Sequence, residues 1–175
     1  LLIDHLAPDD AARLHAQFAE ILGFSNELGE RYAQAAYHAL RAGTAIDPSL
    51  ATSIFSQAGE RARRLTAWAE AAEYFRAAIS AMRRAGSTFD ARACAWNWLR
   101  LGECLRDWGK TAESLEAFRE VRRMSEGGQL GAELSLRAAI AHPPNRVLGG
   151  MDHRAVGRLR AGLSEQGGSL SPGIR

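Results

Sequence analysis

The sequence predicts an all-α fold of about seven to eight helices, paired as antiparallel hairpins. Apolar residues recur at steps of three and four almost throughout, and no run of Val, Ile and Thr alternates as it would in a strand. A related pattern also occurs twice, in residues 55–78 and 98–121. The 175 residues, 46% hydrophobic and 24% charged, have the composition of a packed globular domain.

Helix start and stop signals set the expected boundaries. Asp47-Pro48 is a strong start, because Asp caps a helix and Pro fits its first turn. The other expected caps are Asn26, Thr66, Thr111 and Asp152, and Gly43 is an expected stop. The expected helices span residues 8–22, 26–43, 47–65, 66–84, 89–107, 111–125, 129–142 and 152–163.

The sequence divides into three parts. A helical-repeat domain is predicted for residues 1–142, a loop with a short capping helix for 143–165, and a flexible tail for 166–175. The loop carries Pro143-Pro144, and the tail is rich in Gly, Ser and Pro. Because residue 1 is Leu rather than Met, we expect a fragment or a processed product of a longer polypeptide.

The downstream copy of the pattern follows the tetratricopeptide repeat, a helix hairpin that stacks with its neighbours into a right-handed solenoid. Its repeat-defining positions are Trp98, Leu101, Gly102, Leu105, Gly109, Ser114, Phe118 and Val121. The small residues Gly102 and Ser114 would let two helices approach closely, while Trp98 and Phe118 fill the space around the crossing. The spacing therefore predicts an antiparallel hairpin with Gly109 in its turn.

An upstream copy occupies the same register. Its positions are Phe55, Ala58, Gly59, Ala62, Ala71, Phe75 and Ala78. Gly59 and Gly102 lie 43 residues apart, against a usual repeat of about 34, so about nine extra residues are expected around residues 86–92. Thr66 stands where the turn glycine belongs. Weaker matches are Ala33, Tyr37 and Leu40 for an earlier unit, and Leu134, Ala138 and Ala141 for a later one.

No catalytic, metal or cofactor site is predicted in this chain. Gly109-Lys110-Thr111 resembles the end of a phosphate loop, but six residues separate Gly102 from Gly109 where GxxxxGK[ST] needs four, and no strand precedes them. The five histidines are scattered, without an HExxH helix or a GxSxG elbow. An enzyme using Asp152 and His153 remains a remote alternative.

Charge and cysteine content narrow the function classes. The net charge is only +2, and the arginine clusters lie beside glutamates, as on solvated helix faces, so neither direct nucleic-acid binding nor a membrane span is expected. Cys94 and Cys104 lie ten residues apart without metal-ligand spacing, which predicts buried thiols in a reducing, cytoplasmic compartment.

The predicted partner-binding surface lies on the first helix of each hairpin, which lines the concave face in such arrays. The candidate residues are Ser53, Ser56, Glu60, Arg63 and Arg64 in one unit, and Trp96, Leu99, Glu103, Arg106 and Asp107 in the next. Trp96 is not needed inside its own hairpin, so it either packs on a neighbouring repeat or anchors a partner.

A longer resemblance rests on five stretches: YHALRAG at 37–43, AGERA at 58–62, AAEYFRAA at 71–78, LRAAIA at 136–141 and GGMD at 149–152. Residues 8–165 resemble the helical-repeat segment of large bacterial ATP-binding transcriptional regulators, the maltose-regulator-like and LuxR-type signal-transducing ATPases. The resemblance implies a regulatory arm that senses a protein, a peptide or a small-molecule inducer and controls its own ATPase domain. ATP would bind a neighbouring domain absent from this chain. The alternative is a free-standing tetratricopeptide adaptor for peptides.

Overall fold

The computed structural model describes residues 7–24, 31–86, 90–126, 134 and 137. Across these residues the chain is all-helical, with six α-helices and no strand, which confirms that the fold is all-α. The helices are α1 (Pro8–Phe24), α2 (Tyr32–Ala42), α3 (Pro48–Arg64), α4 (Trp68–Ala85), α5 (Ala91–Asp107) and α6 (Thr111–Glu126). The remaining expected helices, the loop and the tail lie outside the described residues, although Leu134 and Arg137 are helical.

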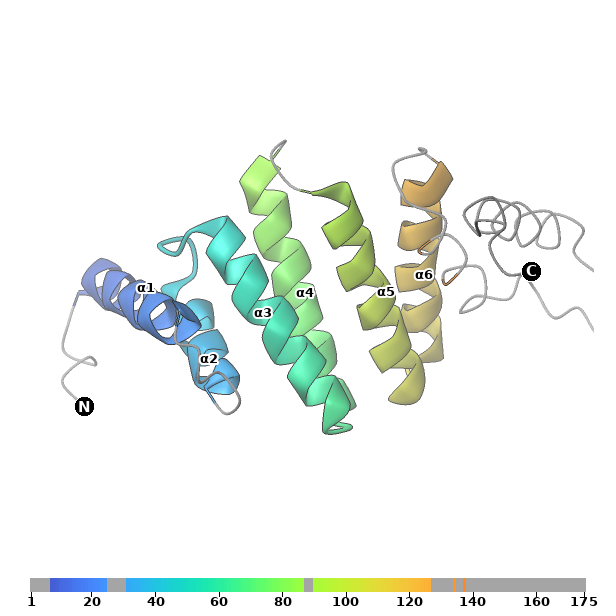
Figure 1. The fold of residues 1–175 in the computed structure, drawn as a ribbon, viewed down its shortest axis with the longest axis horizontal. Coiled ribbons are helices and arrows are strands. Elements are labelled where there is room, and N and C mark those ends of the chain that lie inside the picture. Colours follow the sequence, from blue (N-terminus) through green and yellow to red (C-terminus); the bar gives the residue numbers. More distant parts are fainter. Residues whose placement is uncertain (1–6, 25–30, 87–89, 127–133, 135–136, 138–175) are drawn as a thin grey trace, which may run out of the picture.

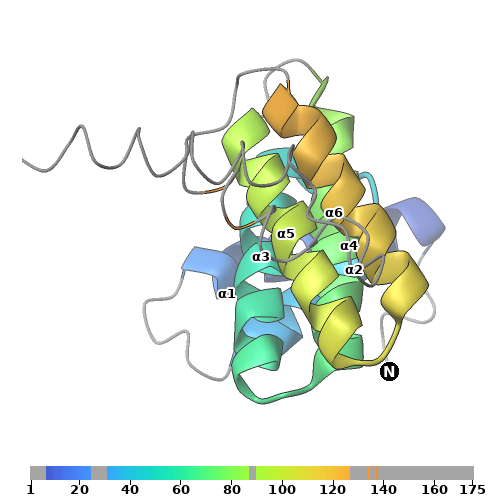
Figure 2. The ribbon, with the colours of Figure 1, turned by 90° about the vertical axis from the view of Figure 1, so that its right-hand side faces the viewer.

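The six helices form a row in which each lies beside its neighbours in sequence (Figure 1). The most extensive contacts join α1 to α2, α3 to α4 and α5 to α6, so the row consists of three hairpins. Each hairpin packs on the next through contacts between α2 and α3 and between α4 and α5. Figure 2 looks along this row, with α5 and α6 nearest the viewer.

The turn between α5 and α6 is a helix stop built on Gly109. Gly109 has a φ of +83°, a conformation that a residue without a Cβ adopts readily. The backbone N–H of Lys110 donates to the carbonyl of Leu105 at 2.7 Å, and that of Gly109 donates to Arg106 at 2.9 Å. These bonds form a Schellman motif, which satisfies the last carbonyls of α5 and reverses the chain.

The turn between α3 and α4 repeats this geometry with a threonine. Thr66 has a φ of +58°, and the N–H of Ala67 donates to the carbonyl of Ala62 at 2.9 Å. Thr66 therefore occupies the turn position that the repeat register assigned to it. The prediction that Thr66 caps α4 is wrong, because Ala67 precedes the helix and makes no side-chain cap.

Two further caps differ in outcome. Asp47 caps α3 as expected, since its Oδ1 accepts the N–H of Leu50 at 2.9 Å. Thr111, in contrast, is the first residue of α6 rather than its cap, because the first turn closes on the carbonyl of Lys110. The predicted cap Asn26 lies outside the described residues.

Glycines bring the helices of each hairpin close together. A Cβ on Gly102 would lie 2.5 Å from the ring of Phe118, and one on Gly59 would lie 2.9 Å from the ring of Phe75. Ser114 Oγ also donates to the Gly102 carbonyl at 2.9 Å. The predicted close approach is confirmed in both hairpins, because each aromatic ring fills the space that a Cβ on the opposite residue would occupy.

Most other repeat-defining side chains are buried. The almost fully buried ones are Phe55, Ala58, Ala71, Ala78, Leu101, Leu105 and Val121. Trp98 is half-buried, packs against the α4–α5 core, and has the guanidinium of Arg83 5.6 Å from its ring centroid. The buried apolar residues form three clusters along the row; Tyr74 packs against the first two, and Trp98 packs against the last two.

Helix α2 faces the core differently from the prediction. Ala33, Tyr37 and Leu40 are exposed, with 51% of Tyr37 and 56% of Leu40 accessible. The buried face consists of Ala35, Ala36, Ala39 and Ala42. The expected register was wrong by two residues, because it turned the larger apolar side chains inward where the interior of this hairpin accepts alanine.

The two cysteines are free and buried. Burial raises the pKa of the Cys104 thiol to about 12, and it also raises the pKa of Cys94. Both thiols therefore stay protonated and packed in the interior. None of the helices in the described part of the chain is long and apolar enough to cross a membrane.

Candidate interaction surface

Side chains from α3 and α5 meet on one side of the row. Those of α3 are Ser56, Glu60 and Arg63, and those of α5 are Trp96, Asn97, Arg100 and Glu103; together they are called the α3–α5 surface. On α3 they follow steps of four and three, and on α5 Trp96, Arg100 and Glu103 do the same, which places each set on one face. Asn97 directly follows Trp96 and is buried. Four residues predicted to contact a partner and one predicted anchor, Trp96, are thus brought together.

Four charged groups form a chain across the two helices. Arg63 Nη2 lies 2.9 Å from Glu60 Oε2, Glu60 Oε1 lies 2.7 Å from Arg100 Nε, and Arg100 Nη1 lies 2.7 Å from Glu103 Oε2. Their side chains are only 14–28% exposed. Burial alone would lower the pKa of Arg63, but the hydrogen bond and charge of Glu60 outweigh burial and raise it.

The central pair is held by charge more than by hydrogen bonding. Glu60 Oε1 and Arg100 Nε are both buried, and neither makes a hydrogen bond of acceptable geometry despite their 2.7 Å separation. A buried charge is costly unless it is well paired, so removing either partner would leave a strongly unfavourable charge. The pair also keeps unused hydrogen-bonding capacity beneath the surface.

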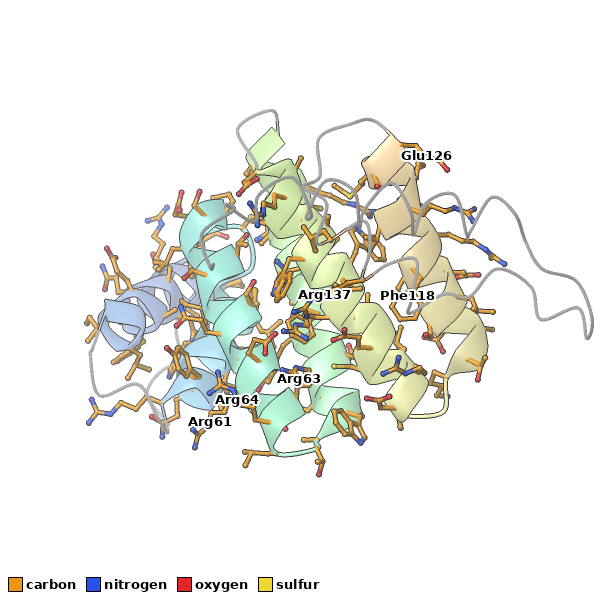
Figure 3. The ribbon with its side chains drawn as sticks, turned by 45° about the vertical axis from the view of Figure 1, so that its right-hand side comes forward. Arg61, Arg63, Arg64, Phe118, Glu126 and Arg137 are labelled. Atoms are coloured by element: carbon orange, nitrogen blue, oxygen red, sulfur yellow. The ribbon has the colours of Figure 1, made fainter. Side chains whose placement is uncertain are left out.

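Trp96 lies beside Arg100, at one side of this row of charged groups. The guanidinium of Arg100 lies 4.4 Å from the centroid of its ring, and that of Arg137 lies 5.3 Å away. Figure 3 shows Arg137 and Arg63 on the same side of the molecule, in the region between α3 and α5. The ring is half-buried and packs on the cluster of Ala95, Leu99, Phe118, Val121 and Leu134, most of which belongs to its own hairpin. Packing on a neighbouring repeat and anchoring of a partner both stay predictions for Trp96.

Asn97 and Arg100 are members of the surface that the sequence patterns did not single out. Ser56 Oγ donates to Asn97 Oδ1 at 2.8 Å, and Asn97 Nδ2 donates to the Ala93 carbonyl at 2.9 Å. An amide on an otherwise apolar helix face was the available signal for Asn97. Arg100 lies four residues after Trp96, a spacing that brings a cation to an aromatic face.

The remaining predicted contact residues lie around or beneath this surface. Ser53 and Arg64 are exposed on α3, and Arg106 pairs with Asp107 at 2.9 Å in the last turn of α5. Leu99 is fully buried against Phe118 and Val121, so its prediction as a contact residue is wrong. Its burial comes from the packing of α5 against α6 and Leu134, which the spacing of residues along α5 alone does not reveal.

Among the described residues, no three His, Cys, Asp or Glu side chains lie together as a metal site would need. Asp152 and His153 lie outside the described residues. Comparison of the chain with protein-family models, curated proteins and solved structures finds no match in any of the three.

Proposed function

We propose that this chain is a non-catalytic interaction module whose α3–α5 surface binds a segment of a protein. The observation that carries the proposal is the half-buried chain of charges from Arg63 to Glu103, edged by Trp96. Tryptophan and arginine are over-represented among residues that dominate binding energy. Both carboxylates and guanidiniums are available at one place, so the surface suits a polar peptide rather than a purely apolar one.

The unaligned central pair favours binding over a purely structural role. Glu60 and Arg100 attract each other by charge but make no aligned hydrogen bond, so a partner group that binds beside them would supply the aligned bonds that the pair lacks. A well-aligned buried pair would offer no such unused donor or acceptor.

The proposal extends to the architecture. The hairpins are those of a tetratricopeptide-like right-handed solenoid, with α3 and α5 on its concave side. Its support is the repetition after 43 residues of both the Schellman turn and the glycine-to-phenylalanine contact. In this setting the chain acts in the cytoplasm as the regulatory arm of a multidomain ATP-dependent transcriptional regulator, and its partner is the ATPase domain or an inducing protein.

A peptide selection tests the proposal. A random-sequence peptide phage library is panned on the immobilised chain, and selected peptides are titrated against wild type, Arg63→Gln and Trp96→Leu. We expect each substitution to weaken binding on the order of tenfold, because each removes a charge-assisted bond or an aromatic contact. Arg13→Gln, on exposed α1, is the matched control and should bind as wild type does.

Two outcomes would contradict the proposal. One is a selection that yields no saturable binder. The other is a set of peptides that bind Arg63→Gln and Trp96→Leu as tightly as wild type while circular dichroism shows all variants folded.

A further inference from the structure

A second hollow lies away from the α3–α5 surface, between α4 and α6 and over α5. Its volume is about 550 Å³, and it is called the α4–α6 chamber. It is lined by Arg76, Ile79, Ser80 and Arg83 of α4, by Trp98, Leu101 and Leu105 of α5, and by Glu113, Glu116, Ala117, Arg119 and Glu120 of α6. Cavities of about 300–1,000 Å³ are typical of small-molecule sites.

The chamber has an apolar floor and charged walls. Leu101 and Leu105 of α5, with Ile79 and Ala117, form the floor. The α4 wall carries Arg76 and Arg83, and the α6 wall carries glutamates at steps of three and four with Arg119 among them. A ligand in the chamber would therefore meet guanidinium groups on the α4 side, carboxylates and one guanidinium on the α6 side, and apolar surface beneath.

An ion pair closes one end of the chamber. Arg76 Nη2 lies 2.5 Å from Glu113 Oε2 and so ties α4 to α6. Arg83 lies seven residues further along α4, which corresponds to about 10 Å of helix. A partner helix, itself about 10–12 Å across, would have to break the tie to lie along the groove, whereas a small molecule would not.

Three charged side chains that line the chamber make no ion pair in the described part of the chain: Arg83 of α4, and Glu116 and Arg119 of α6. Arg83 and Glu116 belong to opposite walls, and Arg83 is positioned by its contact with the ring of Trp98. A ligand with one cationic and one anionic group would provide a counter-ion for Glu116 and another for Arg83.

We propose that the α4–α6 chamber binds a small zwitterion of dipeptide size with apolar side chains, its ammonium held by Glu116 and its carboxylate by Arg83. A dipeptide separates its ammonium and its carboxylate by one more Cα step, about 3.8 Å, than a single α-amino acid does, and it brings two side chains to the floor. The chamber is a site distinct from the α3–α5 surface.

Calorimetric titration with the dipeptide Leu-Phe tests this assignment. We expect saturable binding by wild type, and binding on the order of tenfold weaker by Glu116→Gln and by Arg83→Gln, because each loses a charge-assisted hydrogen bond. Glu20→Gln and Arg13→Gln, both on exposed positions of α1, are the matched controls and should leave the affinity unchanged.

Blocked peptides identify which charge each residue holds. N-acetyl-Leu-Phe should bind as weakly to wild type as Leu-Phe binds to Glu116→Gln, and it should be insensitive to that substitution. Leu-Phe-amide should behave likewise toward Arg83→Gln. Ser80→Trp, which fills the chamber from an exposed position, should abolish binding independently of charge.

The assignment is overturned by either of two results. Wild type that shows no saturable binding of Leu-Phe at millimolar concentration has no such site. Binding that survives unchanged in Glu116→Gln, Arg83→Gln and Ser80→Trp takes place elsewhere. Neither result bears on peptide binding by the α3–α5 surface, since the two tests use different variants.

Discussion

Replacing Gly102 with alanine would drive a methyl group into the ring of Phe118. The new Cβ would lie 2.5, 2.7 and 2.9 Å from three ring carbons, whereas carbon atoms in ordinary contact stand about 3.5–4.0 Å apart. Phe118 is only 1% exposed, so its ring has no solvent-side space into which to swing. The clash must therefore be relieved by moving α6 away from α5.

The expected loss of stability in Gly102→Ala is the cost of overpacking minus the gain in helix propensity. Overpacking of a buried site costs about 1–3 kcal/mol, and the short contacts place Gly102→Ala at the upper end of that range. Alanine is preferred to glycine inside a helix by about 1 kcal/mol, which offsets part of the cost. We expect a net loss of about 2 kcal/mol in the free energy of unfolding, or about 4–8 °C in Tm for a chain of this size.

Urea unfolding followed by far-ultraviolet circular dichroism measures this loss. Gly59→Ala should cost less, because its Cβ would approach the ring of Phe75 only to 2.9 Å. In a Phe118→Leu background the cost of Gly102→Ala should shrink, since the aromatic ring that opposes the methyl group is gone. A Gly102→Ala variant as stable as wild type, or an equal cost in both backgrounds, would refute the ring-contact explanation.

Three further predictions concern the turn, the thiols and pH. Thr66→Gly should raise the free energy of unfolding by about 1 kcal/mol, measured by urea unfolding, because it removes a β-branched residue from a φ of +58°; an unchanged or lower stability would count against this strain. Both cysteines should react with a thiol reagent far more slowly in the native chain than in denaturant, because they are buried and the pKa of Cys104 is about 12; equal rates would contradict their burial. Stability should fall as pH drops below 6.5, because burial, and then the charge of His15, lower the pKa of His38 in the folded chain, so the unfolded chain binds more protons there. His38→Gln should flatten this part of the profile of Tm against pH, and an unaltered slope would assign it to other groups.

The hairpins were predictable from sequence because their determinants are local. The small residues Gly102 and Ser114 indicate a close helix crossing, and Phe118, four residues after Ser114, fills the space around it. The upstream copy has the same pattern 43 residues earlier, and this predicts the same geometry there, including the turn position of Thr66. In both copies, residues within one hairpin determine the contact.

The register of α2 was not predictable in the same way. Its sequence is rich in alanine, and alanine fits a buried and an exposed position about equally well. Periodicity alone therefore favoured the faces that carry Tyr37 and Leu40, which the structure leaves exposed. Only the packing of α2 between its neighbours selects the alanine face.

The candidate sites were predicted in part for a related reason. The helix face bearing Ser56, Glu60 and Arg63 follows from spacing on one helix. The pairing of Glu60 with Arg100 depends on how α3 and α5 are placed relative to each other, which no pattern within one helix records. The α4–α6 chamber likewise needs three helices in place before its walls face one another.

The all-alanine inner face of α2 sets a gradient of local unfolding along the row. Each buried alanine removes only one methyl group from water, so α2 gains much less from burial than helices that contribute Phe75 or Phe118. Backbone amides in α1 and α2 should consequently exchange with deuterated solvent before those of α4 and α5. Among the six described helices, we therefore expect the N-terminal hairpin to open before the others.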